Sequence, residues 1–382
     1  MALKNMGFKG GYPDPCLMKR KDERGTVFIA LYVDDCLCVG DKEAIASLEK
    51  EFAEQGLQVK PPEELTDYLS CEIEMSKDRR AAILRQGHLI KKLRKLFGEK
   101  VKGLANYKTP GTPNGGMVRP TDQENVVDKE EHSLYRTGVG MLLYLVKHTR
   151  PDIANAVREL TKMNDCPTVA AVKEMHRVIK FVLDSEFKGL KMRPIFKGGL
   201  WNIVAYSDSD YAGDKDTRIS VSGYIIFLNG APVSWRSKAQ RSVTLSSSEA
   251  EYVASSEAAK EVKFIYMVLH AMGFEVKLPI TVRVDNIGAI FMAENVTTSN
   301  RTKHVDTRFR FVNEFVKDKF IDVIFVKTKD NTADIFTKNT SSEISEVHHK
   351  SMLGEIQNQQ EGCWNDDVEF ESADDERTKG ND

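Results

Sequence analysis

The sequence predicts a mixed α/β protein with more than one hydrophobic core. Its 382 residues are 41% hydrophobic and show no extreme compositional bias, which is enough material for two or three domains. Strand patterns alternate with amphipathic helix patterns in the first hundred residues, three helical patterns follow, and a segment in the order βββαβαβα runs from Trp201 to about Lys338. We therefore expect an α/β segment, a helical segment and a second α/β segment.

The first α/β segment contains a hairpin with an acidic tip. The run TVFIALYVDDCLCVG has two apolar strands that meet at Asp34 and Asp35. Adjacent aspartates at a hairpin tip are often simple turn residues, because the side chain bonds its own backbone. The apolar strands on both sides instead favour a tip held rigidly against a core, as a metal-binding carboxylate must be. A helix over 41–55, strands within 65–84 and a helix over 87–99 are expected next.

The middle of the chain predicts a linker and then a small helical bundle. Residues 109–121, TPGTPNGGMVRPT, concentrate Pro and Gly, which break helices and strands, so we place a boundary there. Helical patterns follow at 132–149, 151–164 and 167–185. The last two open with Pro151 and Pro167, which suit the first turn of a helix.

The second α/β segment brings acidic residues to the ends of elements. An acid-rich strand end near Tyr206 precedes a helix with two more acids, Asp285 follows an apolar strand, and Asp334 starts a final helix. Two magnesium ions roughly 3.5–4 Å apart need several such carboxylates. Asp208 or Asp210 can serve from the strand. Glu249 and Glu251 lie on opposite flanks of the helix, because two residues turn about 200°, so only one can face the site.

The cysteines and the histidine pair carry no metal signal. The six cysteines include no CxxC pair, which argues against zinc and against a disulfide framework. Cys36 and Cys38 share one face of a strand, where we expect buried free thiols. His348 and His349 have no partner ligands nearby in sequence, so we expect an exposed polar pair.

Charge and hydropathy indicate a protein of the cell interior with an acidic end. No stretch approaches the ~18–20 apolar residues that cross a bilayer, and the N-terminus lacks the apolar core of a secretory signal. We expect a cytoplasmic or nuclear protein without a membrane partner. Residues 361–382 hold nine acids against Arg377 and Lys379, a local charge of −7, so the rest carries +5 of the total −2. We expect 341–382 to be an acidic, disordered tail.

Several motifs together resemble one family. LYVDDCLCVG resembles the YVDD box of reverse transcriptases, and GFKGGYPDPCLM, YRTGVGMLLYL and TRPDIANAV resemble palm and connection segments. YSDSDYAGD, SWRSKAQ, SSSEAEY, VDNIGAI, RTKHVDTRFRFV and NTADIFTK are similar to the RNase H domain of copia-type LTR retrotransposon polyproteins. The resemblance covers about residues 1–340 in the family's own order, and the chain departs from the family after Thr340.

The resemblance implies a domain order. Residues 1–108 would form a partial reverse-transcriptase palm with the YVDD hairpin and a following α/β segment, and 109–121 would be the linker. Residues 122–196 would form a helical region like a thumb or connection. Residues 200–340 would form an RNase H-like domain with a mixed five-stranded sheet and flanking helices.

The resemblance also implies an activity and its residues. It assigns Asp208, Glu251, Asp285 and Asp334 as the metal-binding catalytic acids of an RNase H. It leaves Asp210, Asp214 and Asp216 as exposed turn acids, and Glu249 as a surface or helix-start acid. The cofactor would be Mg²⁺, as two ions, with Mn²⁺ as a substitute, and the reaction would be endonucleolytic hydrolysis of RNA in an RNA–DNA hybrid.

The polymerase half of the resemblance is incomplete. Asp34 and Asp35 match the metal-binding acids of the YVDD box, but in this family the third carboxylate and the fingers lie upstream of that box. Only about thirty residues precede it here. We expect RNA-directed DNA polymerase activity on template RNA and primer DNA to be lost, or to depend on a missing fingers and palm region or on polyprotein partners.

Substrate contacts are expected on backbone and sugar, because an enzyme that degrades a transcribed template cannot depend on base sequence. The 2′-hydroxyl is the group that distinguishes RNA. The basic residues of one helix either follow the phosphates of a nucleic-acid strand or form a solvated helix face. They are Lys91, Lys92, Arg94 and Lys95.

Arg236 and Lys238 are candidates to line the hybrid near Trp235, which could equally belong to a core. His304 is either a phosphate contact or structural, and no histidine precedes Asp334 in VKTKDNTAD.

Two alternatives to a competent nuclease stay open. The chain could be a non-catalytic retroelement-derived module that binds nucleic acid, or a structural partner domain of a larger polymerase. Magnesium-dependent cleavage of RNA only within a hybrid separates the first interpretation from these two.

Overall fold

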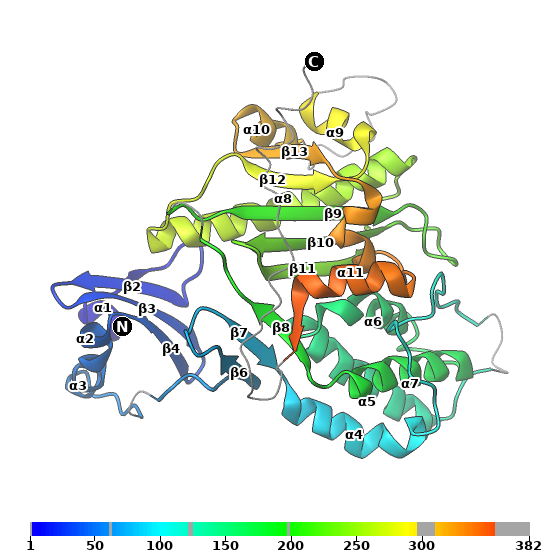
Figure 1. Cartoon of the computed structure of the whole chain (residues 1–382), viewed down its shortest axis with the longest axis horizontal. Coiled ribbons are helices and arrows are strands. Elements are labelled where there is room, and N and C mark those ends of the chain that lie inside the picture. The colour runs from blue at the N-terminus through cyan, green and yellow to red at the C-terminus, as the bar shows by residue number, and fades with distance from the viewer. Residues whose placement is uncertain (1, 61–62, 121–124, 197–198, 296–309, 356–382) are drawn as a thin grey trace.

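The computed structural model describes residues 2–60, 63–120, 125–196, 199–295 and 310–355. In this part of the chain, helices pack with three β-sheets (Figure 1). The mixed α/β class expected from the sequence is therefore observed.

The first sheet is a four-stranded antiparallel meander at the N-terminal end. Its order is β1 (Lys9–Gly10), β2 (Leu17–Asp22), β3 (Gly25–Tyr32) and β4 (Asp35–Gly40). Alternate residues of β3 point inward, so Val27 and Ile29 are fully buried against α2 (Lys42–Ala46) and α3 (Leu48–Glu54). The helix expected over 41–55 is thus interrupted at Ser47. A short helix, α1 (Ala2–Asn5), precedes the sheet.

Strand β4 is the edge of this sheet, and its side chains are mostly open to solvent. Cys36 is exposed and Cys38 is half-buried, with their Sγ atoms 3.6 Å apart. The two thiols do share a face, as a strand requires, but the expectation that both are buried is wrong, because on this edge strand Cys38 only borders the N-terminal core and Cys36 stays exposed.

The helical region forms one hydrophobic core that includes a helix from before the expected linker. Its members are α4 (Gly87–Val101), α5 (Lys129–His148), α6 (Ala154–Thr161) and α7 (Val169–Asp184). Phe97 of α4, Leu142 of α5 and Val178 of α7 are all fully buried in it. The division at 109–121 therefore does not coincide with a division between cores.

Pro151 and Pro167, each predicted to start a helix, lie at different positions relative to the helices that follow them. Pro151 opens a short 3-10 turn, η1 (Pro151–Ile153), directly before α6. Pro167 lies before the α7 cap instead, because the Thr168 side chain accepts a hydrogen bond from the Ala171 amide and so sets the first helical turn. The expectation for Pro167 is wrong by two positions, because the first helical residue is Val169.

A second antiparallel sheet joins distant parts of the chain. Its order is β14 (Leu353–Glu355), β8 (Lys188–Met192), β7 (Ala82–Arg85), β6 (Cys71–Met75) and β5 (Asp67–Tyr68). The segment before β14 is a helix, α11 (Ser342–Met352), whose His348 and His349 are buried. The exposed pair expected there is wrong, and the disorder expected from residue 341 is wrong for 342–355. Residues 356–382 lie outside the described part.

The third sheet has five strands in mixed orientation. Its order is β11 (Ala231–Ala239), β10 (Val221–Leu228), β9 (Ile203–Asp210), β12 (Ile280–Val284) and β13 (Ile321–Phe325). Strands β9, β10 and β11 pair antiparallel, whereas β9, β12 and β13 pair parallel. Figure 1 shows the long helix α8 (Ser247–Met272) along one face, with α9 (Ile287–Glu294) and α10 (Phe311–Lys317) at the β13 end.

Both faces of this sheet are buried. In β10, Tyr224 and Ile226 face the core that contains α8, while Ile225 and Phe227 face the opposite core. That second core includes the turn η4 (Thr332–Phe336), α11 and Ala154 of α6. The segment at Asp334, expected as a final helix, is therefore a short 3-10 turn that follows another, η3 (Thr328–Asp330).

The described helices include none with the length and apolar content that a bilayer crossing requires.

Candidate metal centre

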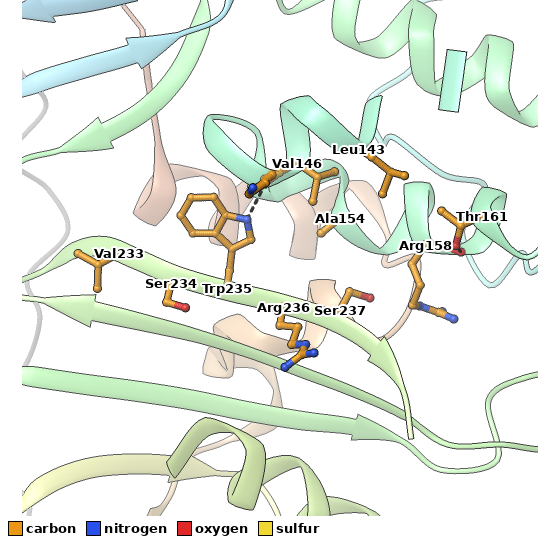
Figure 2. Close-up of a pocket in the computed structure, with 11 residues that line it drawn as sticks. Leu143, Val146, Ala154, Arg158, Thr161, Val233, Ser234, Trp235, Arg236 and Ser237 are labelled. Atoms are coloured by element: carbon orange, nitrogen blue, oxygen red, sulfur yellow. Dashed lines mark hydrogen bonds between the residues drawn. The ribbon is translucent and has the colours of Figure 1, made fainter. Parts of the chain in front are cut away.

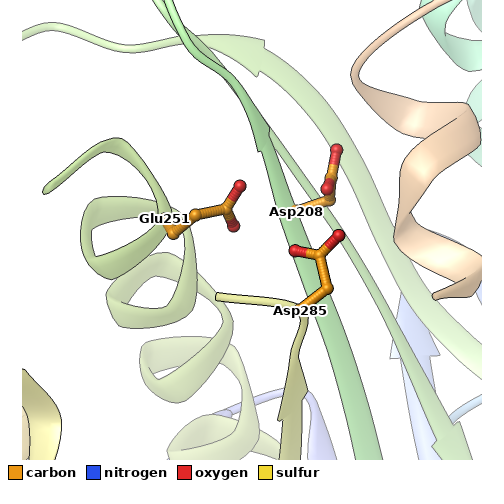
Figure 3. Close-up of side chains that lie close together, drawn as sticks. All are labelled: Asp208, Glu251 and Asp285. Carbon is orange, nitrogen blue, oxygen red and sulfur yellow. The ribbon is translucent and has the colours of Figure 1, made fainter. Parts of the chain in front are cut away.

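Four elements bring acidic residues to one end of the five-stranded sheet. Asp208 lies near the end of β9, Glu251 in the second turn of α8, Asp285 directly after β12, and Asp334 in η4. The side chains of Asp208, Glu251 and Asp285 point toward one another (Figure 3). Three segments far apart in sequence thus converge on one point.

Three of these acids are close enough to share a cation. One carboxylate oxygen from each of Asp208, Glu251 and Asp285 lies within 4.8 Å of the other two. Asp208 is 3% exposed and Glu251 6% exposed, while Asp285 is half-buried. Asp334, 3% exposed, lies outside this trio but close enough to Asp208 to act on its ionisation.

Local hydrogen bonds hold the trio in place. The Ser209 amide donates to Glu251 Oε1 at 3.1 Å, which ties α8 to β9. The Thr337 hydroxyl donates to Asp208 Oδ2, which ties the end of η4 to the same strand. Asn331 donates from Nδ2 to the Ser207 carbonyl at 3.0 Å and accepts from the Ala333 amide, so one side chain both starts η4 and anchors it on β9.

Helix N-caps fix the positions of Glu251 and Asp285. Ser246 accepts from the Glu249 amide and starts α8, so Glu251 falls on the face toward β9. Asn286 accepts from the Ala289 amide and starts α9, which leaves Asp285 between the end of β12 and the first turn of α9.

The arrangement disfavours the ionised form of Asp208 and Glu251 and so raises their pKa. Burial raises the pKa of Asp208, and the nearby Asp334 carboxylate raises it further, while Lys338 opposes both. Burial also raises the pKa of Glu251, and the carboxylates of Asp208 and Asp285 add to that rise. Like charges held close together out of water favour the protonated form or a bound cation.

The donor set fits a hard divalent cation. Carboxylate oxygens are the ligands that Mg²⁺ and Mn²⁺ prefer, and the cluster contains no sulfur or imidazole donor. Glu251 Oε2 is buried without a hydrogen-bond partner, which is unusual for a buried carboxyl oxygen. A cation bound between the three carboxylates would satisfy that oxygen and offset their repulsion.

The neighbouring acids lie elsewhere. Glu249 Oε2 accepts from the Leu245 amide at 2.7 Å, so it is a helix-start acid, although a buried one. Asp210 is half-buried at the end of β9, and Asp216 is exposed. Asp214 is buried and forms an ion pair with Lys162 at 2.6 Å, so its description as an exposed turn acid is wrong. Its partner is the residue directly after α6, and the sequence did not connect that position to this loop.

The basic residues predicted to contact substrate divide into two groups. Those of α4 are exposed, and in Figure 1 this helix lies far from β9, with α5 and β11 between them. Its residues are Lys91, Lys92, Arg94 and Lys95. Arg94 pairs with Glu186 at 2.5 Å, as expected of a solvated helix face.

The second group lies on β11, in the same sheet as Asp208. Arg236 and Lys238 line a cavity of about 340 Å³ together with Arg241 and Lys260, and Glu257 partly offsets their charge. Lys238 has its pKa lowered, first by the charge of Arg236. A cavity with this crowding of positive charge suits a phosphate group.

Trp235 joins the sheet to the helical region. Its Nε1 donates to the Val146 carbonyl at 2.7 Å, and the ring is half-buried (Figure 2). It lines a second cavity of about 350 Å³ between β11 and the helices, whose lining also includes Arg158 and Arg236. Its place is thus at the border of a core.

The other predicted site residues are not part of this centre. Val33 and Asp34 form the exposed two-residue turn of the hairpin, with Val33 at a φ of 54°, and Asp35 is the exposed first residue of β4. Within the described residues, no third carboxylate, histidine or cysteine completes a metal group with them. His304 lies outside the described residues.

Two residues at the centre were absent from the sequence-based prediction. Lys338 Nζ forms an ion pair with Asp334 Oδ1 at 2.5 Å, and the Thr337 hydroxyl contacts Asp208. The signal was present, because both directly follow Asp334 in NTADIFTK. A tight turn after Asp334 returns these side chains to the acids.

Comparison with known proteins places the chain among retroelement proteins. It is 32% identical over 344 residues to the retrovirus-related Pol polyprotein from transposon TNT 1-94 of Nicotiana tabacum, which covers 88% of this chain and 25% of that protein. It is 31% identical over 339 residues to the Pol polyprotein from transposon RE1 of Arabidopsis thaliana, covering 89% of this chain and 22% of that protein. The chain thus spans about a quarter of the length of these relatives.

No protein-family model matches the chain. Among solved structures, the N-terminal RNase H domain of Rv2228c from Mycobacterium tuberculosis aligns with a TM-score of 0.26 and 12% identity, covering 39% of this chain and 97% of that one. That similarity is too low to support an argument, so assignment rests on the sequence relatives. By its extended identity to them, the chain belongs to the Pol polyproteins of copia-type retrotransposons.

Proposed function

We propose that the chain is an RNase H-type endonuclease that hydrolyses the RNA strand of RNA–DNA hybrids with the help of divalent metal ions. The observation that carries the proposal is the convergence of Asp208, Glu251 and Asp285 within 4.8 Å, with Asp334 next to Asp208. A buried cluster of like charges destabilises the folded state, and such a cost is typical of a functional site. The chemistry of this cluster fits cation binding, which would offset the repulsion.

The residues would divide the work of holding the ions. Asp208, Glu251 and Asp285 would bind one Mg²⁺, and Asp208 with Asp334 would bind a second, with Mn²⁺ as a substitute. When bound, these ions would activate water as a nucleophile and stabilise the charge that develops on the phosphate. The Ser209 amide and the Thr337 hydroxyl fix the orientation of Glu251 and Asp208, so the ligands are arranged before any ion arrives.

Substrate binding would use the basic cavity on the same sheet. Arg236, Lys238 and Lys260 there suit phosphates of the hybrid, so contacts would go to the backbone and not to base edges. The exposed charges of α4 are too far from the centre to contribute to the same contact.

Polymerase activity would need a third metal-binding carboxylate near Asp34 and Asp35. Asp34 and Asp35 present two carboxylates at an exposed tip without a third acid from the described residues. RNA-directed DNA synthesis on template RNA and primer DNA would therefore depend on polyprotein sequence beyond the chain.

The test is cleavage of a labelled RNA–DNA hybrid by the full chain in Mg²⁺. We expect cuts within the RNA strand of the hybrid, and none in single-stranded RNA or duplex DNA. Asp208→Asn and Asp285→Asn should each lower the rate by about 100-fold or more, because each removes a ligand from the shared centre.

Glu249→Gln is the matched control. Glu249 is buried in the same helix, its Oε2 accepts from the Leu245 amide at the helix start, and glutamine keeps an acceptor oxygen for that amide. Cleavage by this variant should stay within about threefold of the wild-type rate. Hybrid binding by the wild-type chain without any cleavage would instead support a non-catalytic nucleic-acid-binding module.

A further inference from the structure

A positively charged side chain, that of Lys338, lies among the acids. Lys338 Nζ is 2.5 Å from Asp334 Oδ1, and the lysine side chain is 45% exposed while that of Asp334 is 4% exposed. The lysine therefore reaches from the solvent side of η4 toward a carboxylate that is otherwise buried. The Lys338 amide also bonds the Asp334 carbonyl at 3.3 Å, so the two residues are linked by one tight turn.

The charge of Lys338 acts on three carboxylates. Asp334 is its direct partner, and Asp208 and Asp210 also respond to its charge. From α6, Arg158 and Glu159 face Asp210 as well, and their opposite charges largely offset each other. Lys338 is therefore the main positive charge on the Asp334 side of the centre.

Among the described residues, the opposite side of the centre has no such partner. The groups acting on Glu251 are the carboxylates of Asp208 and Asp285 and the amide and side chain of Ser209. Its Oε2 is buried without a hydrogen bond. The two sides of one cluster therefore differ: one is already neutralised by a side chain, and the other is open to a cation.

We propose that Lys338 is a tethered counter-ion that occupies the Asp334 side of the centre and that a second divalent cation must displace. This inference rests on the proposed metal-dependent function and deepens it. The first ion would bind between Asp208, Glu251 and Asp285 without competition. The second, at Asp208 and Asp334, would bind more weakly, because it must replace an ion pair that already exists. The chain would load its two ions in a fixed order.

The test is a titration of the full chain with Mn²⁺, in which electron paramagnetic resonance counts free ions and no nucleic acid is present. The wild type should bind one ion tightly and a second more weakly. Lys338→Met should tighten the second site by about tenfold or more and the first by about threefold or less, since Lys338 pairs directly with Asp334 and acts on Asp208 without an ion pair. Lys338→Arg, which keeps the charge, should retain the wild-type pattern.

Lys350→Met is the matched control, because Lys350 pairs with Glu346 on the exposed side of α11 at 3.7 Å and removing it changes net charge equally. It should bind both ions as the wild type does. Two wild-type sites that Lys338→Met leaves unchanged would overturn the counter-ion proposal alone. A wild-type chain that binds no Mn²⁺ would overturn both this proposal and the metal-dependent function. Thermal melts without metal report whether Lys338→Met is folded, and Lys338→Gln gives a second test if it is not.

Discussion

Glu249 and Glu251 are two residues apart in α8 and have different surroundings. Glu249 binds the Leu245 amide at the helix start, whereas Glu251 accepts from Ser209 of β9. The helical period shows from sequence that only one can face the sheet, and the AEY pattern of the resemblance selects Glu251. The sequence held no comparable signal for the burial of Asp214, because its partner Lys162 caps the end of a helix that only the tertiary fold brings near.

The buried acids also predict how stability depends on pH. The pKa of Asp208 is raised from 3.8 to about 7 and that of Glu251 from 4.5 to about 9, both chiefly by burial. The folded chain then holds protons that the unfolded chain has released. Without metal, the contribution of these two acids to the free energy of unfolding should therefore fall as pH rises from about 4 to about 9.

Asp208→Asn should weaken this dependence and raise the melting temperature at pH 8 by about 2 °C or more, because it removes one buried charge. Calorimetry in EDTA measures both effects. Asp318→Asn, at the exposed end of α10, is the control and should change neither. A lower melting temperature for Asp208→Asn would contradict the raised pKa.

At the scale of elements, one glycine lets η4 approach the sheet. Gly223 of β10 lies opposite Asp208 of β9. A Cβ at position 223 would come within 2.7 Å of Phe336 Cβ and 2.8 Å of Thr337 Cγ2, closer than real side chains pack. The gap left by this glycine allows Thr337 to reach Asp208.

Gly223→Ala should therefore displace η4 and weaken Mn²⁺ binding at the Asp334 side by about tenfold, with cleavage reduced in parallel. Binding titration and the hybrid assay measure this. Gly140→Ala on α5 is the control, because its added Cβ meets nothing within 4 Å and alanine favours a helix. Unchanged metal affinity in Gly223→Ala would show that the turn tolerates the shift.

The sequence predicted the elements with strong periodicity and missed those without it. The hairpin, α4 to α7 and the strand–helix order after Trp201 follow from apolar spacing. Helix α11 was missed although its buried positions are spaced as on a helix: Ser345, His348, His349 and Met352. Three of these four residues are polar, so the buried face has no hydrophobic signal. Burial also lowers the pKa of His349 to about 4, despite the opposing charge of Asp152.

At the scale of the whole molecule, the helical region and the five-stranded sheet share a core. Ala154 of α6, Phe227 of β10, Phe336 of η4 and Met352 of α11 belong to one cluster. Beside it, Arg150 and Asp152 form a fully buried ion pair at 2.8 Å, and Arg150 also donates to Ser185 at the end of α7. We expect these parts to unfold together, because each contributes buried apolar side chains to this shared core.

Met352→Ala should lower the free energy of unfolding by about 2–5 kcal/mol, because the side chain is fully buried in that shared core. The loss should appear in one transition that also reports on Trp235, at the border between sheet and helices. Denaturant unfolding followed by circular dichroism and by tryptophan fluorescence compares the two signals. Val347→Ala on the exposed side of α11 is the control, and separate transitions would contradict a shared core.

The pairing of β14 with β8 has a consequence for the continuity of the backbone. These strands lie 161 positions apart, from residue 192 to residue 353, and are hydrogen-bonded neighbours in one sheet. The intervening residues therefore form a loop closed by the sheet, and that loop contains every acid of the metal centre. A single break of the chain inside it, for example in the turn after α8, would leave two pieces that the β8–β14 ladder and the shared core still hold together.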